Sequence, residues 1–135
     1  MDAATMLKQT SLFAEMSDDD IEELAESTRI EIYKPDRIIV REGHAGAALY
    51  VMISGKVEVV KGIADGEEIV VGTLGAGDFF GEVAVMKHVA RSASVRAVED
   101  TECLVVRMLD LESFIERYPG IDAKVESALS RRFDD

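Results

Sequence analysis

One segment of the sequence combines the residue types needed to hold a small phosphorylated molecule. It reads FGEVAVMKHVARSASVRA over residues 80–97, with Gly81 and Glu82 before a short apolar turn and Arg91 ten residues after the glycine. A single helical turn between strands leaves backbone N–H groups that attract an anion, and an arginine returned by the next strand can grip that anion with its planar fork. Glu82 would repel a phosphate but can accept a hydrogen bond from a sugar hydroxyl. Phosphate, hydroxyl and apolar flank together indicate a nucleotide.

This segment interrupts a region of short β-rich runs. Between residues 29 and 108 they are RIEIY, RIIVRE, ALYVMI, KVEVVK, EEIVVGTL, SASVRAV and ECLVVRM, and none shows a helical period. Turn signals separate them at KPD, EGHAG, SG, GIADGE and GAGD. Such spacing is typical of an antiparallel sheet that is closed or packed face to face. The middle of the chain is therefore predicted to be a β-barrel or jelly roll.

Helical patterns lie on both sides of this region. Ser17 is a candidate N-cap with Asp20 closing a capping box, and Met16 can form a hydrophobic staple with Ile21. The aspartates of the DDD run favour the positive helix end, which explains them better than a metal site does. Near the other end, LDLESFIERYPG predicts a helix stopped by proline and glycine, and IDAKVESALSRRF predicts another.

Length and composition limit the class of protein. The 135 residues fit one domain with its own core, and 47% hydrophobic with 31% charged residues is the balance of a globular protein. Cys103 is the single cysteine, so no internal disulfide can form, and its apolar strand ECLVV predicts a buried, inert thiol. No apolar run reaches the roughly 18–20 residues of a membrane span and no signal peptide is evident, so we expect a cytoplasmic protein.

Charge and histidine content argue against two further classes. The net charge of −12, with 15 basic residues scattered among 27 acidic ones, argues against binding nucleic acid. His44 and His88 are the only histidines, too few for a multi-histidine metal centre, and exposed loop positions are the better interpretation. The candidate site holds an acid and an arginine but no nucleophile or metal cluster, so no enzyme and no catalytic residue is predicted.

Two ordered sets of residues resemble a known family. IVREGHAGAALYVMISG, residues 39–55, carries three glycines and the run LYVM at the family's spacing. The positions that match the family's phosphate-binding cassette are Gly81, Glu82, Ala84, Arg91, Ala93, Val95 and Ala97. The sequence thus resembles the cyclic nucleotide-binding domains of bacterial catabolite activators, protein kinase regulatory subunits and nucleotide-gated channels. A lone glycine–glutamate pair is weak, whereas the ordered set is specific.

The resemblance implies a fold and its boundaries. We expect a mainly β chain, an antiparallel jelly-roll β-barrel with an N-terminal helix, a short phosphate-binding helix and C-terminal helices. A single domain covers residues 1–135, helical over 1–28, barrel over 29–108 and helical again over 109–133. The 26 residues that follow Leu109 are too few for the winged DNA-binding domain of the activators. A protein partner or a fused effector domain is therefore expected to carry the output.

The resemblance also implies roles for individual residues. Arg91 should pair with the cyclic phosphate, and the backbone N–H groups of Ala84 and Ser92 should add donors. Glu82 should accept the ribose 2′-hydroxyl with help from the Gly81 backbone. The remaining expected ligand contacts are Ala93 in the cassette and, flanking the base, Val83, Val70 and Val71. Taken singly, Arg91 could be a solvated strand residue and Glu82 a helix cap.

Ligand identity and the lid stay open. The Ser92 hydroxyl suits cyclic GMP and cyclic AMP alike, and it can equally serve as one more phosphate donor, so cyclic AMP is only modestly favoured. Phe133 with Arg132 could close over the base, although packing on the preceding helix or fraying is an equal alternative. The leading function is a regulatory module whose C-terminal helices repack on binding. The alternative is an interaction module that kept the fold and lost the ligand.

Overall fold

The helices and strands were located in a computed structural model that describes residues 2–10, 13–14, 16–44, 48–81 and 93–117. The elements are α1 (Ala3–Gln9), α2 (Asp18–Glu26), β1 (Arg29–Tyr33), β2 (Ile38–Val40), β3 (Ala48–Ser54), β4 (Lys56–Lys61), β5 (Ile69–Gly75), β6 (Phe79–Phe80), β7 (Ser94–Ala97), β8 (Thr101–Arg107) and α4 (Met108–Arg117). The expected strands are confirmed, with small differences at their ends, and so are the expected turns, except that part of the EGHAG turn lies outside the described residues.

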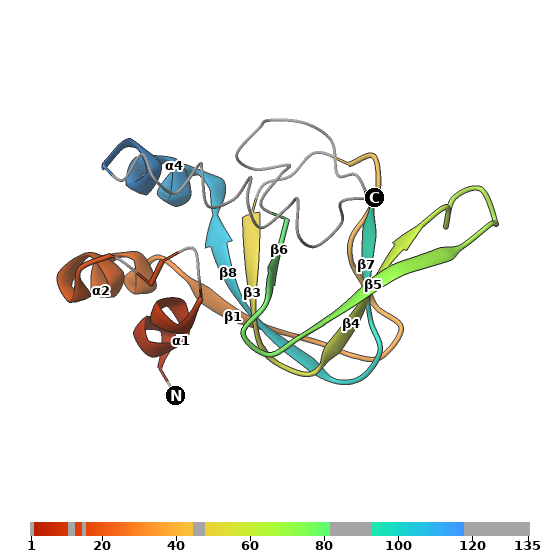
Figure 1. Cartoon of the computed structure of the whole chain (residues 1–135), viewed down its shortest axis with the longest axis horizontal. Helices are drawn as coiled ribbons and strands as arrows, with labels where there is room; N and C mark the ends of the chain where they lie inside the picture. Colours follow the sequence, from red (N-terminus) through yellow and green to blue (C-terminus); the bar gives the residue numbers. More distant parts are fainter. Residues whose placement is uncertain (1, 11–12, 15, 45–47, 82–92, 118–135) are drawn as a thin grey trace.

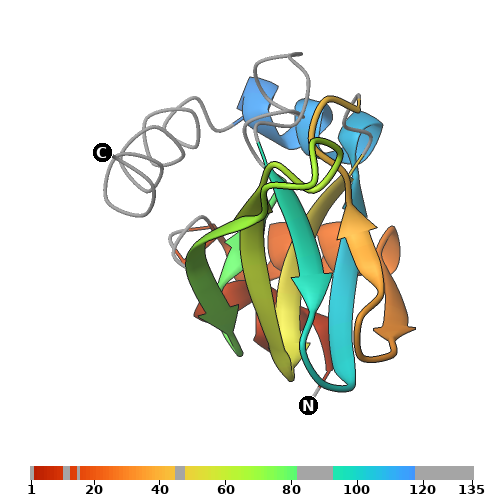
Figure 2. The same cartoon turned by 90° about the vertical axis from the view of Figure 1, so that its right-hand side faces the viewer.

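The strands form two four-stranded antiparallel sheets (Figure 1). Sheet A has the order β1-β8-β3-β6 and sheet B the order β2-β7-β4-β5. Strands that follow one another in the sequence often lie in different sheets, which is the arrangement of a jelly roll. The predicted mainly β jelly-roll fold is confirmed. Seen from the side of sheet B in Figure 2, helices α1 and α2 lie on the far side of the molecule.

Two hydrophobic clusters hold these layers together. The inter-sheet cluster contains Tyr33, Val40, Met52, Val57, Val59, Leu74, Phe80, Val95, Ala97 and Cys103. The helix-side cluster joins the N-terminal helices to sheet A and contains Met6, Leu7, Phe13, Met16, Ile21, Leu24, Leu49, Val51, Phe79, Leu104 and Val106. Alternate residues of β3 and β8 therefore serve opposite faces of sheet A, as the period of two in a strand requires.

The predicted start of α2 is confirmed. The Ser17 hydroxyl oxygen accepts the Asp20 backbone N–H at 3.2 Å and donates to the Asp20 carboxylate at 2.8 Å. Met16 and Ile21 are 3% and 2% exposed in the helix-side cluster, as a staple across the helix start requires. The three aspartates occupy the first turn, where the helix dipole favours them.

Two short elements were not singled out by the sequence pattern. Helix α1 begins after Asp2, whose carboxylate accepts the Thr5 N–H at 2.8 Å, and it buries Met6 and Leu7. Strand β6 has only two residues, paired with Tyr50 and Val51 of β3. A run that short has no period to detect, so neighbouring strands alone define it as a strand.

The C-terminal prediction is confirmed as far as the described residues reach. Helix α4 starts directly after β8 and runs through the predicted segment to Arg117. The second predicted C-terminal helix and the short phosphate-binding helix lie outside the described residues. Among the residues that the structure describes, no helix is long and apolar enough to cross a membrane.

Candidate functional site

The structure describes part of the predicted ligand site. Five predicted contacts lie outside the described residues: Glu82, Val83, Ala84, Arg91 and Ser92. The possible lid residues Arg132 and Phe133 lie outside them as well. Gly81, Ala93, Val70 and Val71 are described, and so are the elements that lead into and out of the cassette. The frame around the cassette can therefore be built from the residues upward.

The cassette is entered through β6. Phe80 pairs with Tyr50 of β3, and the two rings stack with centroids 5.0 Å apart and an interplanar angle of 7°. Phe80 is 2% exposed in the inter-sheet cluster, which fixes the last strand residue before the cassette. Gly81 follows with φ of +90°, a left-handed conformation that L side chains rarely adopt. Glycine is therefore needed where the chain leaves sheet A.

The chain leaves the cassette into β7. Ala93 packs against the inter-sheet cluster, and Val95 and Ala97 belong to it. Strand β7 is inserted between β2 and β4 in the middle of sheet B. Both described flanks of residues 82–92 are thus fixed to the same cluster, one through sheet A and the other through sheet B.

Alternation along β7 sends its polar residues outward. Because Val95 and Ala97 face the inter-sheet cluster, Ser94 and Arg96 face away from it, on the outer face of sheet B. Ser94 is nevertheless only 4% exposed, so other residues cover it. The Ser94–Val60 pair of β7 and β4 places Val60 on the same outer face, where it is fully buried.

Val70 and Val71 do not occupy equivalent positions. Val59 pairs with Gly72 and Val60 with Val70, so β5 carries one extra residue, Val71, in a β-bulge. Residues opposite each other share a face, which places Val70 on the outer face with Val60. Val71 lies at the bulge and is 43% exposed. The strand pairing therefore places the Val70 side chain on the outer face, but it does not place the Val71 side chain there.

Two consecutive hydrogen bonds lead to Ser94 on the outer face. The Glu42 backbone N–H donates to Ser94 Oγ at 3.0 Å, and the Gly62 N–H donates to Glu42 Oε1 at 3.1 Å. Two turns and the first residue of β7 are therefore joined by consecutive hydrogen bonds. The first turn follows β2 and the second follows β4.

Arg96 makes a second connection on the same face. Its Nη1 lies 3.1 Å from both oxygens of Glu68, and its Nη2 lies 3.3 Å from Glu58 Oε2. The two carboxylates raise the pKa of the Arg96 guanidinium. This ion-pair group connects β7, β4 and the segment before β5. The sequence reasoning did not identify Glu42, Ser94 or Arg96, although alternation in SVRA could have placed Ser94 and Arg96 together.

The described residues offer little other chemistry. Burial raises the pKa of the fully buried Cys103 thiol to about 12, in agreement with the predicted inert thiol. His44 is exposed, as expected for a loop, while His88 lies outside the described residues. No group of histidine, cysteine and acidic residues that could hold a metal ion occurs within the described ranges. The frame is suited to fixing a binding segment at both ends.

Known proteins are similar to this chain over most of its length. Residues 30–118 match the family model described as the cyclic nucleotide-binding domain. A protein of Rhodopseudomonas palustris that is named a putative potassium channel protein is 34% identical over 129 residues, which cover 95% of this chain and 31% of that protein. A cyclic AMP receptor protein of Thermus thermophilus is 32% identical over 126 residues, 93% of this chain and 58% of that protein.

A solved structure is also similar to this chain. The crystal structure of Thermus thermophilus catabolite activator protein superposes with a TM-score of 0.77 at 32% identity, over 90% of this chain and 57% of that chain. The chain thus spans less than two thirds of the length of each of these proteins.

Proposed function

The chain belongs to the cyclic nucleotide-binding domain family, and on that premise we propose that it binds cyclic AMP in preference to cyclic GMP as a regulatory module. The supporting observation is the frame around residues 82–92. Phe80 and Ala93 fix the two ends of that segment to the inter-sheet cluster. Because the described flanks on both sides are held by one packed cluster, they are pre-organised for binding, which lowers the cost of association.

The proposed contacts follow the cassette residue by residue. Arg91 pairs with the cyclic phosphate, and the N–H groups of Ala84 and Ser92 donate to it. Glu82 accepts the ribose 2′-hydroxyl beside the Gly81 backbone. For the base, the bulge position makes Val71 a better candidate than Val70, because Val70 shares the outer face with Val60. Val83 and Ala93 complete the proposed set.

The name of one relative supports cyclic AMP as the ligand. The Thermus thermophilus relative is named a cyclic AMP receptor protein, and 32% identity over 93% of this chain makes a shared ligand the simplest proposal. The Ser92 hydroxyl is compatible with either base. Because both nucleotides carry the same phosphate and ribose, the choice between them must be made at the base edge.

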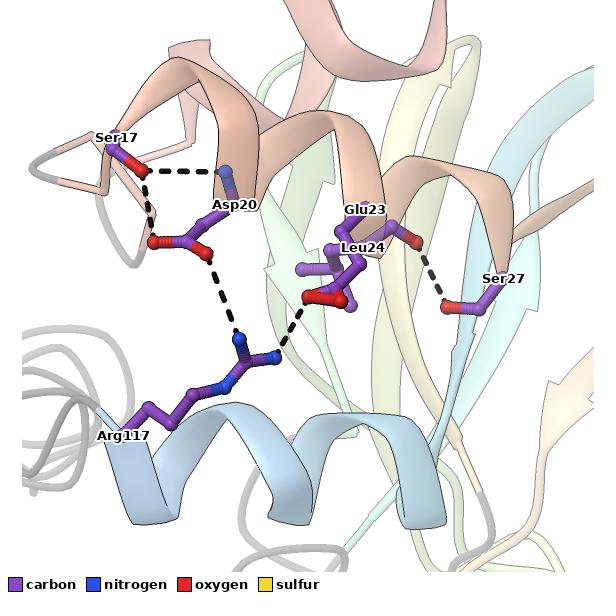
Figure 3. A network of polar contacts seen from close by, with 6 residues as sticks. All are labelled: Ser17, Asp20, Glu23, Leu24, Ser27 and Arg117. Atoms are coloured by element: carbon purple, nitrogen blue, oxygen red, sulfur yellow. Dashed lines mark hydrogen bonds and ion pairs between the residues drawn. The ribbon is translucent and has the colours of Figure 1, made fainter.

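The proposed output is mechanical and involves no catalysis. Helix α4 follows β8 without a break, and Arg117 at its end contacts α2 (Figure 3). A ligand that shifts the cassette could therefore bias how the helices pack. A partner protein or a fused effector would read that change, in the cytoplasm.

Calorimetric titration with cyclic AMP and cyclic GMP tests the proposal. Wild-type protein is expected to bind both, cyclic AMP more tightly. Arg91→Ala should weaken binding by about 2–5 kcal/mol, because it leaves a desolvated phosphate charge unpaired. Arg91→Lys should also bind poorly, since an ammonium cannot replace the bidentate fork.

Arg37→Ala is the matched control for this titration. Arg37 lies over the Tyr33 ring at 5.7 Å, in the turn after β1 at the other end of the roll. Its loss should leave affinity unchanged. Equal affinity of wild type and Arg91→Ala would remove the assigned phosphate contact. Absence of binding by wild type would favour the interaction module without ligand.

A further inference from the structure

The hydrogen bonds on the outer face of sheet B reach the strand that leaves the cassette. Ser94 lies three residues after Arg91, and its hydroxyl oxygen accepts the Glu42 N–H at 3.0 Å. Ser94 is 4% exposed whereas Glu42 is exposed, so the acceptor end of this bond is buried and the bond as a whole is partly buried. The first residue of β7 is therefore attached to the turn after β2, and its position depends on the position of that turn.

That turn is held by the Glu42 side chain. Its Oε1 accepts the Gly62 N–H at 3.1 Å, in the loop between β4 and β5. The Gly62 carbonyl in turn accepts the N–H groups of Asp65 at 3.2 Å and Glu67 at 3.1 Å. Gly62 has φ of +84°, and a Cβ there would meet the Glu67 carbonyl oxygen. The loop is thus internally bonded, and the carboxylate attaches to its first residue.

We infer that Glu42 is a positioning residue for the nucleotide site, an inference that rests on the proposed function. Its carboxylate anchors the turn after β2 to the β4–β5 loop, and the same turn bonds Ser94 and so restrains the start of β7. Residue 42 itself acts through Ser94 and is not assigned a ligand contact. Without the anchor, the binding-competent arrangement is less populated, and apparent affinity falls by that fraction.

The test compares Glu42→Leu with Glu42→Gln. Leucine removes the acceptor for the Gly62 N–H, whereas glutamine keeps an oxygen at the same reach. Titration of the full chain with cyclic AMP is expected to give about three- to fivefold weaker binding for Glu42→Leu, the low end of the net contribution of one hydrogen bond, because this bond is exposed. Glu42→Gln should bind within about twofold of wild type, since its amide oxygen remains an acceptor.

Glu102→Leu is the matched control. The Glu102 carboxylate accepts the Ser54 hydroxyl at 3.0 Å, at the end of sheet A away from β6. Like Glu42→Leu, this variant replaces a glutamate whose carboxylate accepts a hydrogen bond. It therefore measures any general effect of losing a carboxylate. Its affinity for cyclic AMP should equal that of wild type.

Hydrogen exchange provides a readout that is independent of ligand. The amides of β7, residues 94–97, should exchange faster in ligand-free Glu42→Leu than in wild type, and Glu42→Gln should restore protection. Ser94→Ala removes the other bond in the series. Glu42→Leu and Ser94→Ala interrupt the same series of hydrogen bonds. The double variant should therefore lose less affinity than the sum of the two single losses.

The possible outcomes separate this inference from the proposed function. Absence of nucleotide binding by wild type overturns the proposed function and the inference with it. Binding by wild type together with unchanged binding by Glu42→Leu overturns the inference alone. Equal weakening by Glu42→Leu and Glu102→Leu, or failure of Glu42→Gln to restore affinity, also overturns it, since the effect would then be general destabilisation or loss of charge.

Discussion

Gly55 shows how one residue can be fixed by its surroundings. It forms the turn between β3 and β4 with φ of +94°, and a Cβ there would lie 2.5 Å from Asp100 O and from Thr101 Oγ1. Gly55→Ala should therefore reduce the free energy of unfolding by about 3 kcal/mol or more, from left-handed strain plus overlap. Denaturant unfolding measures the difference.

Gly66→Ala is the control for that prediction. Gly66 has φ of +75°, but a Cβ added there would meet no atom within 4 Å, so only the backbone term applies. Its replacement should reduce stability by about 1 kcal/mol. Equal losses at the two positions would show that the close approach to Asp100 and Thr101 contributes nothing.

The buried thiol of Cys103 should make the free energy of unfolding depend on pH. Burial raises the pKa of its thiol from 9.0 to about 12, so the folded protein keeps this proton between those values while the unfolded chain releases it. The folded state then binds more protons, and the free energy of unfolding must fall as pH rises through that window. Cys103→Ala should show a smaller fall between about pH 9 and pH 11 in denaturant titrations. An identical slope would contradict a buried neutral thiol.

At the scale of elements, Arg117 connects the two helical parts of the chain. Its guanidinium lies 2.9 Å from Glu23 Oε2 and 3.6 Å from Asp20 Oδ1, bridging α4 to α2 (Figure 3). The three side chains are 26–57% exposed, and ion pairs that solvent can reach contribute about 0.2–1 kcal/mol. Arg117→Ala should hardly change the free energy of unfolding. The amides at residues 113–117 should nevertheless exchange faster, because the last turn of α4 loses its ion pairs with α2.

Lys34→Ala is the control for the helix bridge. Lys34 Nζ lies 3.6 Å from Asp100 Oδ2, another exposed pair, which joins the turn after β1 to the turn before β8. Its loss should produce a similarly small change in stability and no change in the exchange of α4. Unchanged exchange in Arg117→Ala would mean that α4 is held by other contacts.

At the scale of the whole molecule, the net charge of −12 acts against an anionic ligand. The Debye length shortens from about 30 Å at 0.01 M salt to about 8 Å at 0.15 M, which screens the long-range repulsion. The association rate of cyclic AMP should therefore rise, by about twofold or more, over this range of salt. Stopped-flow binding measures it.

Adenosine serves as the uncharged reference for the salt series. Any salt effect on its association reports changes in the protein itself, because it carries no phosphate. A cyclic AMP rate that falls with salt would show that a local positive potential near the cassette outweighs the field of the whole molecule.

Local sequence patterns were sufficient to predict the strands, the turns, the start of α2 and the candidate cassette. These features have local causes: a period of two along β3 or β8, glycines between runs, and a capping serine at position 17. The buried thiol of Cys103 was predictable for the same reason, because its apolar neighbours in the strand indicate burial.

The contacts between distant segments could not be predicted from local patterns and became visible only in the folded chain. The bond between Glu42 and Ser94 joins residues 52 positions apart, and that between Glu42 and Gly62 joins residues 20 apart. β6 exists because Phe79 and Phe80 meet β3, and the bulge at Val71 appears only once β5 is paired with β4. Pairing register and chain crossing between two sheets are global properties, so no window of neighbouring residues contains them.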